Sequence, residues 1–498
     1  MLTENAYGDS RPSCPSYWPR VREFAVPPSM IETATARRLA GDWAGACAAA
    51  GVDVDLNLRS VARTHGRELA SQLRADLRHL APDLLRWHMP RIAPDGLLRP
   101  GLTLTLARYD ATGPAGARAV HLVARTAPAW ADAGQRISLA LWDGSGAHPH
   151  SPAHADAGAR RHPHPHPNRR FRLDLHRHLW DARRAGELRI RSGADRPPGG
   201  DGEGGDIPVP GPELPEWVPQ GRRCALDRWA AEAELLFHAD GRATGTGTGA
   251  VTVRIGARHR LLLELVAAPD GNGPPTSRIT AVPPDGVASV LPVLPDAATW
   301  VLPDLELIRT GAIEPDRLHP LVAAALVPDR PPTGPPRSPD RAGEPRPVEC
   351  RGARHRIGLV DGVLVPLDHD PAEIRREELL AALTGTPLPC LRAIDEAHRH
   401  PDCLTGVRER LDHGDIAGAL AVVEGLLGPD AVLRGGALRD ELETAARRRI
   451  TYGLFRAGLI GPGPGLGPGS APVPVPLPPH GRIRPKGRRS RSRRSTFR

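Results

Sequence analysis

Apolar residues recur at helical spacing in the N-terminal part of the chain. Three apolar side chains four residues apart predict one helix over residues 37–50. Leucines at steps of three and four predict more helix over residues 61–87. Pro82 should divide this second stretch, because proline fits the first turn of a helix better than its interior. Between the two stretches, residues 52–58 alternate apolar and polar side chains and predict a half-buried strand or an extended link.

The middle of the chain changes to strand-like patterns. Leucine and threonine alternate over residues 102–109, and apolar runs follow at 120–124 and 137–142 after Gly and Pro turns, which predicts a three-stranded antiparallel meander. A short helix is expected near residues 175–185. Further strands are predicted at residues 171–175, 188–190, 235–238, 251–255, 261–266, 279–282 and 287–291.

Two apolar runs, residues 356–360 and 363–367, flank the dipeptide Asp361-Gly362. This is a strong signal for a β-hairpin, because Asp-Gly adopts the tight turn that matches the twist of two paired strands. Residues 371–459 return to helical spacing.

Together these patterns predict an α+β fold, with a helical N-terminal segment, a β-rich antiparallel middle region with disordered insertions, and a C-terminal region of β-hairpin plus helices. The 53 glycines and 56 prolines exceed what regular elements hold, so part of the chain should be loop or disorder. The predicted divisions are 1–20 (flexible leader), 21–95 (mainly helical), 96–310 (β-rich, with disordered insertions at 144–168 and 192–221), 328–350 (disordered linker), 351–460 (hairpin plus helical domain) and 461–498 (disordered Gly/Pro spacer and basic tail).

One short pattern occurs twice. Residues 41–48 and 414–421 share glycine, aspartate and small residues in the same order. Glycine would end one helix, aspartate would cap the next, and the small residues would let the two helices approach closely. The alternative is a chance similarity in a chain rich in Ala and Gly.

The formal net charge of +9 is located at the C-terminal end. Residues 481–498 hold nine cations and no acid, so the preceding 480 residues are formally neutral. These nine cations are the candidate contacts for a polyanion such as nucleic acid, or for an acidic partner surface; a solubilising extension is the other interpretation. They are Arg482, Arg484, Lys486, Arg488, Arg489, Arg491, Arg493, Arg494 and Arg498.

Several kinds of chemistry lack the residues they need. Lys486 is the only lysine, which excludes Walker-type phosphate loops, kinases and Schiff-base enzymes. The six cysteines form no C-x-x-C pair, and so predict neither a disulfide framework nor a zinc site. Eight histidines lie between His148 and His178, but the His-Pro alternation at residues 162–166 points successive side chains in different directions. We therefore expect a flexible insertion there, with weak adventitious metal binding as the alternative.

Other candidate motifs favour structural roles. Residues 245–249 precede a predicted strand and not a helix, so they predict a turn and not a nucleotide loop. Residues 53–64 lack the Gly and Glu of a calcium loop. Asp361, Asp368 and Asp370, with His369, follow the hairpin and are expected to act mainly as helix caps. The sequence predicts no catalytic residue, cofactor or metal ligand.

Three segments carry a family resemblance: residues 38–47, residues 84–91 and residues 450–455. They resemble segments of uncharacterised proteins from high-GC bacteria that accompany MoxR-type ATPases and von Willebrand factor A domain proteins. The resemblance implies such an ATPase as a partner and brings no active residue with it.

The function expected from these observations is that of an intracellular scaffold or adaptor linked to an ATPase assembly. Met1 to Pro12 lacks an apolar core and no apolar run is long enough to span a bilayer, so a cytoplasmic protein that does not enter the membrane is expected. The alternatives are an enzyme whose site is assembled from distant residues, and a nucleic-acid-associated protein that binds through its tail.

Deletion of residues 481–498 is expected to abolish binding of the chain to duplex DNA without changing its melting temperature. For the full chain, log K should fall against log salt concentration with a slope of roughly −3 to −6, since each phosphate contact contributes about −0.9 and a flexible tail engages only part of its charge. Binding titrations at several salt concentrations measure both quantities. A truncated chain with the same affinity and slope would place the binding surface elsewhere.

Overall fold

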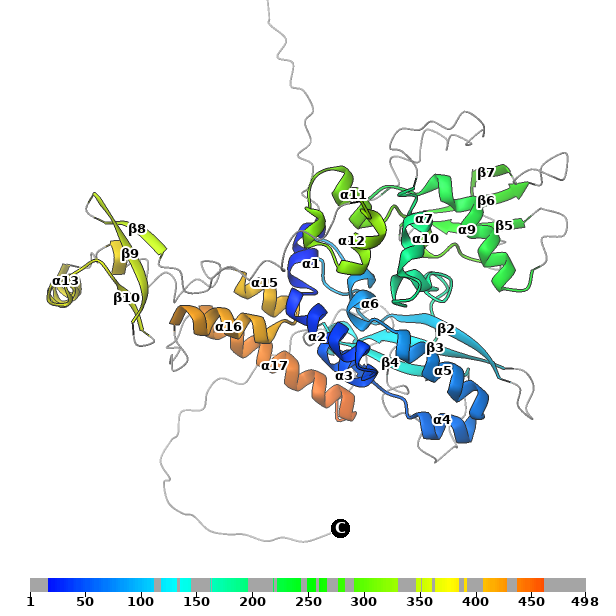
Figure 1. Ribbon diagram of the computed structural model, residues 1–498, viewed down its shortest axis with the longest axis horizontal. Coiled ribbons are helices and arrows are strands. Elements are labelled where there is room, and N and C mark those ends of the chain that lie inside the picture. The colour runs from blue at the N-terminus through cyan, green and yellow to red at the C-terminus, as the bar shows by residue number, and fades with distance from the viewer. Residues whose placement is uncertain are drawn as a thin grey trace, which may run out of the picture. The chain divides into compact units, whose positions relative to one another are not determined.

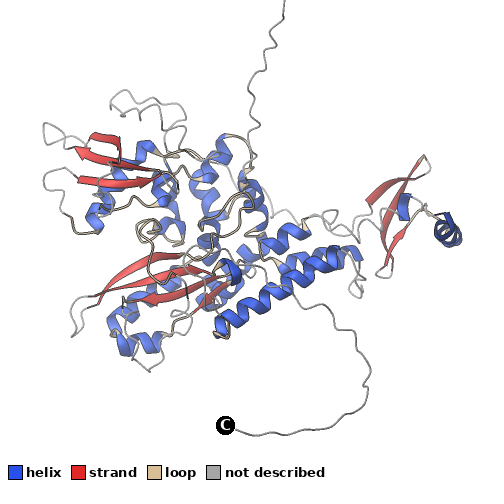
Figure 2. Cartoon of the chain, turned by 180° about the vertical axis from the view of Figure 1, so that it is seen from behind, coloured by secondary structure: helices blue, strands red, loops and turns tan. Residues whose placement is uncertain are grey.

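The computed structural model shows a mixed fold of helices and antiparallel sheets, as the sequence predicts (Figure 2). None of the helices in the part of the chain that it describes is long and apolar enough to cross a membrane. The described residues are 17–111, 118–131, 135–144, 162, 164–195, 218, 222–242, 249–256, 259–266, 276–282, 291–329, 346–350, 352–360, 363–384, 389–391, 406–427 and 437–460.

Short helices make up the N-terminal part. Pro82 occupies the first turn of its helix, so the predicted division of residues 61–87 is confirmed. Leu69, Leu73 and Leu77 are buried along one face of the longest of these helices. The elements are α1 (Trp18–Phe24), α2 (Pro28–Leu39), α3 (Trp43–Ala49), β1 (Val52–Val54), α4 (Leu58–Thr64), α5 (Arg67–His79) and α6 (Pro82–His88) (Figure 1).

The first sheet has the order β1-β4-β3-β2. β2 (Thr103–Ala111), β3 (Arg118–Thr126) and β4 (Ile137–Trp142) form the predicted antiparallel meander. β1 extends it in parallel with β4. The half-buried strand predicted over residues 52–58 is therefore confirmed for its first three residues.

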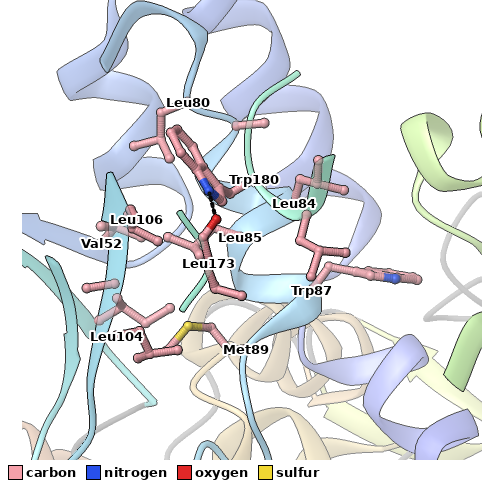
Figure 3. Packing of buried hydrophobic residues seen from close by; sticks show 14 of the residues in the cluster. Val52, Leu80, Leu84, Leu85, Trp87, Met89, Leu104, Leu106, Leu173 and Trp180 are labelled. Carbon is pink, nitrogen blue, oxygen red and sulfur yellow. Dashed lines mark hydrogen bonds between the residues drawn. The ribbon is translucent and has the colours of Figure 1, made fainter. Parts of the chain in front are cut away.

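The largest hydrophobic core lies between this sheet and the N-terminal helices (Figure 3). Leu104 and Leu106 of β2 pack there with Leu84 and Leu85 of α6. Trp180 is fully buried in the same core, and its indole Nε1 donates to the Leu173 carbonyl oxygen at 3.0 Å. Residues on both sides of position 95 contribute to this one core.

A second sheet consists of β5 (Gly249–Arg254), β6 (Arg260–Val266) and β7 (Thr276–Ala281), paired antiparallel in that order. The predicted strands at residues 251–255, 261–266 and 279–282 are thus confirmed within a few residues. Helix α9 (Leu226–Ala239) packs against this sheet through Trp229 and Phe237, which belong to the same hydrophobic core. A Cβ on Gly249 would lie 2.7 Å from the Phe237 ring, so this close packing requires glycine.

The strand predicted at residues 235–238 is wrong, because these residues form the last turn of α9. Trp229, Ala233 and Phe237 are buried four residues apart, which continues a helical face. A short apolar run cannot by itself distinguish a strand from a buried helix, and here the longer spacing decides.

Other predictions in this region also need correction. Residues 188–190 begin helix α7 (Leu188–Ser192), and residues 171–175 form turns joined to β2 by a single bridge. The short helix expected near residues 175–185 is replaced by two 3₁₀ turns, Arg177–Leu179 and Ala185–Glu187. Three more helices follow: α10 (Asp296–Thr299), α11 (Pro303–Arg309) and α12 (Pro320–Leu326). Most of the strand predicted at 287–291 and the turn at 245–248 lie outside the described residues.

The predicted hairpin is confirmed. β9 (Ala353–Val360) and β10 (Val363–Pro366) pair antiparallel, and Val360 lies opposite Val363. β8 (Arg346–Cys350) pairs with β9, so the linker predicted over 328–350 is wrong for its last five residues. The predicted helical region is confirmed by α13 (Pro371–Thr384), α15 (Val407–Asp412), α16 (Ile416–Leu427) and α17 (Ala437–Ala457).

Two further disorder predictions are wrong at their ends. The leader predicted over 1–20 enters α1 at Trp18. In the insertion predicted over 144–168, His162 is buried and its Nε2 lies 2.8 Å from the Thr126 carbonyl oxygen. The Asn168 amide donates to the Thr103 carbonyl oxygen at 2.9 Å, so this end of the insertion is held against the edge of β2.

The sequence pattern that occurs twice forms the same turn in both places. We call it the glycine–aspartate turn; it joins α2 to α3 and α15 to α16. Gly41 and Gly414 have φ values of 79° and 86°, a left-handed conformation that glycine adopts without strain. The amides of Asp42 and Asp415 donate to the carbonyl oxygens of Arg37 and Arg410, which completes the Schellman motif that ends the first helix.

The same aspartate then begins the second helix. Asp42 Oδ1 accepts from the Gly45 amide at 2.8 Å, and Asp415 Oδ1 accepts from the Gly418 amide at 2.9 Å. The other carboxylate oxygen binds the arginine five residues earlier, at 3.2 Å for Arg37 and 3.0 Å for Arg410. The predicted roles of glycine and aspartate are therefore confirmed in both copies.

Replacement of Gly45 or Gly418 by alanine is expected to lower the melting temperature of the protein. The new Cβ would lie 2.1 Å from the aspartate Oδ2, so the carboxylate must move and the helix loses a cap, which costs about 1 kcal/mol. Gly453→Ala in α17 is the matched control, because nothing lies within 4 Å of its Cβ position and alanine should stabilise the helix by about 0.5–1 kcal/mol.

Thermal denaturation followed by circular dichroism measures these effects. In the Asp42→Ala background, Gly45→Ala should no longer destabilise the protein, since the atom it would meet is gone. An equal loss in both backgrounds would show that the turn does not act through this contact.

Candidate functional site

The nine cations predicted to contact polyanions lie outside the described residues, and so does Asp361. The other acids near the hairpin have structural partners. Asp370 accepts from the Ala372 amide at 2.9 Å, which confirms its predicted role as the cap of α13. Asp368 binds the Arg356 guanidinium at 2.8 Å, and the His369 ring stacks on His355 at 4.1 Å between centroids.

The described residues contain no cluster of three or more histidine, cysteine, aspartate or glutamate side chains placed to hold a metal ion. The three residues that resemble the start of a calcium loop separate. Asn57 caps α4, Asp53 binds Arg136, and Asp55 binds Arg456.

The thiols of Cys47 and Cys224 are poor candidates for nucleophiles. Burial raises the pKa of Cys47 to about 12, with the nearby charge of Asp42 as a second cause. Burial likewise raises the pKa of Cys224 to about 11. Both side chains are therefore protonated near neutral pH, whereas the thiolate is the reactive form.

One histidine–aspartate pair has the geometry of a catalytic dyad but occupies a structural position. His319 Nε2 lies 3.0 Å from Asp83 Oδ2, and both side chains are buried. His319 Nδ1 accepts from the Leu321 amide and caps α12. Because both ring nitrogens have partners within the protein, this pair joins α12 to α6.

A polar clasp attaches the end of α17 to the first sheet. The Tyr452 hydroxyl and the Arg136 guanidinium both donate to Asp53, and Arg456 forms a two-nitrogen ion pair with Asp55. Although burial by itself favours the protonated acid, the hydrogen bonds from Arg136 and Tyr452 hold the pKa of Asp53 below its ordinary value.

A cavity of 20 Å³ lies beside this clasp, with Asp55, His162 and Phe455 in its walls. That volume holds about one water molecule and no larger ligand. The clasp therefore fixes the position of the C-terminal helices on the sheet, and its role is structural.

The strongest candidate for a binding surface is one face of α16. Leu420 and Ala421 lie three and four residues after Ala417, Glu424 lies three and four residues after them, and all four residues are exposed. Three of these four side chains are apolar, and Leu420 is 41 % exposed. Helix α16 is thus an amphipathic helix with a partly apolar outer face.

The first copy of the glycine–aspartate turn differs from the second at one position of this face, since Ala44 and Ala48, the counterparts of Ala417 and Ala421, are also exposed. Cys47 occupies in α3 the position that Leu420 occupies in α16, counted from the capping aspartate. Cys47 is fully buried in the largest core, together with Leu84 and Leu85 of α6, and α3 contacts α6. The same position is therefore covered by a helix in one copy and open in the other.

No family model, curated protein or solved structure matches this chain. The open face of α16 and the charged groups around α17 are described from the chain alone.

The buried side chains of His88 and His176 make stability depend on pH. Burial lowers the pKa of His88 to about 4, and burial together with the charge of Arg191 lowers the pKa of His176 to about 3. The unfolded chain takes up these protons near pH 6.5, and the folded chain only at much lower pH. The free energy of unfolding should therefore be highest above pH 6.5 and fall from there toward pH 4 and 3.

We expect His176→Gln to reduce this dependence by about 1.4 kcal/mol per pH unit between roughly pH 6 and 4. Urea denaturation at a series of pH values measures it. His238→Gln, at an exposed position near the end of α9, is the control and should leave the slope as it is. An unchanged slope in His176→Gln would mean that this histidine is already protonated in the folded chain.

Proposed function

We propose that this protein is a non-catalytic adaptor that binds a helix of a partner protein on the exposed face of α16. The observation that carries the proposal is the difference between Cys47, which is buried beneath other helices, and Leu420, which is 41 % exposed at the equivalent position. Since the same turn sets the direction of both second helices, the open copy presents a surface of the kind that the closed copy already uses for packing.

A helix is the expected occupant. Small residues on a helix face allow close approach of another helix, and Ala417 and Ala421 flank Leu420 on this face. In the first copy α3 contacts both α2 and α6, and α6 contributes leucine side chains to the core that holds Cys47. A partner helix with leucines at steps of three and four would fit the α16 face in the same way.

The proposed partner is a MoxR-type ATPase, because segments of this chain resemble proteins that accompany such ATPases. The proposed setting is the cytoplasm. In this proposal, residues 481–498 supply a second contact, which is sensitive to salt, with an acidic surface of the partner or with nucleic acid.

The clasp between α17 and the sheet supports this role. Helices α15 and α17 contact each other, and Val407, Val423 and Leu438 form a shared hydrophobic core among α15, α16 and α17. Because Asp53 and Asp55 hold the end of α17, they also fix the direction of the α16 face. A preorganised surface loses less conformational entropy when it binds.

Leu420→Arg is expected to weaken binding to the ATPase about tenfold or more, because it places a charge in the centre of an apolar contact. The matched control is Leu235→Arg on α9, since Leu235 is 43 % exposed and lies on a different helix. The experiment has two parts: capture of the ATPase from the native host by the tagged full-length chain, and then measurement of affinity with both proteins purified.

The proposal requires that wild type and Leu235→Arg bind equally and that Leu420→Arg does not. Equal affinity of all three chains would exclude the α16 face as the docking surface. A loss of binding only on deletion of residues 481–498 would locate the interaction in the tail.

A further inference from the structure

A second surface feature is an open cleft of 340 Å³ beside α17. One wall consists of Leu97, Trp130 with the alanines on either side of it, and Gln135. The other wall consists of Asp412 at the end of α15 and of Thr444, Arg447, Arg448 and Thr451 on α17. Its volume is at the lower end of the range of small-molecule sites.

Two guanidinium groups line the α17 wall. Arg447 binds Glu443 at 3.0 Å through Nη2, and Arg448 binds Asp412 at 3.1 Å through Nη1. Both arginines remain largely exposed, at 63 % and 47 % of their side-chain surface. A guanidinium carries five N–H donors in a fixed plane, so each can keep its carboxylate and still donate to an oxyanion in the cleft.

More positive charge is buried beneath the cleft. Arg86 donates to the carbonyl oxygen of Gln135, which lines the cleft, and to that of His413, which follows Asp412 of the opposite wall. Arg91 donates to the Arg86 carbonyl oxygen. Both arginine side chains are buried. Cations in a region of low dielectric project a stronger field into an adjoining cleft than cations in water do.

The pKa of His413 shows the effect of these buried charges. Its ring is 1 % exposed, and neither ring nitrogen has a hydrogen-bond partner among the described residues. Burial, followed by the charges of Arg91 and Arg86, lowers the pKa of His413 to about 3. The neighbouring carboxylates, Asp412 and Glu409, are already paired with Arg448 and Arg20. Because the pairs Arg447–Glu443 and Arg448–Asp412 are each neutral, the excess positive charge around the cleft comes from the buried Arg86 and Arg91.

Trp130 gives the cleft an aromatic wall. Its ring meets the Phe455 ring edge to face, with centroids 5.3 Å apart, which holds the indole in place. Gln135 beside it has a φ of 54°, an uncommon conformation for a residue other than glycine. Such conformations are concentrated at binding sites, where the surrounding structure enforces them.

We infer that this cleft binds a phosphate monoester that carries an aromatic ring, of about the size of a mononucleotide. The phosphate lies between Arg447 and Arg448, and the ring lies along Trp130. This site is separate from the α16 face and does not depend on the proposed adaptor function. A ligand held by both walls connects the β3–β4 segment to α17, and so also stabilises the folded chain.

Isothermal titration of the full-length chain with adenosine 5′-monophosphate tests this inference, with adenosine and inorganic phosphate as the two partial probes. The monophosphate should bind more tightly than either partial probe and should raise the melting temperature. The double variant Arg447→Gln/Arg448→Gln should weaken its binding at least about tenfold, since it removes the charge-assisted hydrogen bonds to the phosphate. Trp130→Leu should weaken the binding of the monophosphate but not the binding of inorganic phosphate.

Arg439→Gln is the matched control. Arg439 lies on the same helix, binds the same Glu443 at 2.8 Å and is 52 % exposed, but it does not line the cleft. It should bind the monophosphate as the wild type does.

Three results would overturn the inference. The first is no measurable heat up to about 10 mM ligand, a concentration at which a specific site should be filled. The second is equal binding by wild type and the double variant, which would locate phosphate binding in residues 481–498. The third is an equal loss in Arg439→Gln, which would show a general effect of charge on α17.

Discussion

A carboxylate with no access to water must be matched by donors, and Asp304 imposes this requirement on the N-terminal half of the protein. Its side chain is fully buried in α11. It accepts from Arg22 Nη2 at 2.7 Å and from the Trp87 indole Nε1 at 3.1 Å. Loss of one partner from such a buried pair costs about 3–5 kcal/mol. Helices α1, α6 and α11 are therefore bound to one another, although their sequences are far apart.

Other carboxylates that are partly or fully buried also link distant segments. Asp53 and Asp55 receive Tyr452 and Arg456 from α17, and Glu232 receives Arg191 through two nitrogens. The position of α17 in turn decides which way α16 faces and where Arg447 and Arg448 lie relative to Trp130. Both proposed binding surfaces thus depend on ion pairs that themselves perform no chemistry.

Local sequence rules predicted the features whose cause is local. Pro82 starts a helix because its ring fixes φ and it has no amide proton to donate. The dipeptide Asp361-Gly362 predicted that the strands on either side of it would pair, because only a few dipeptides favour a tight hairpin turn. The glycine–aspartate turns could be predicted because the glycine that adopts the left-handed conformation and the aspartate that caps the next helix are adjacent in the sequence. Where several structures were compatible with the same short apolar run, as at residues 235–238, the sequence alone led to the wrong one.

The sequence by itself determined the α+β class, the two glycine–aspartate turns and the caps of α3 and α16, since these depend on backbone conformations that each residue carries with it. Only the tertiary structure decided that Cys47 is covered and Leu420 is not, although the same motif precedes both. It alone brought Trp130 opposite Arg447, and Asp304 to Arg22. The reason is physical: burial and pairing depend on which distant segments pack together, and a short stretch of sequence does not specify its neighbours.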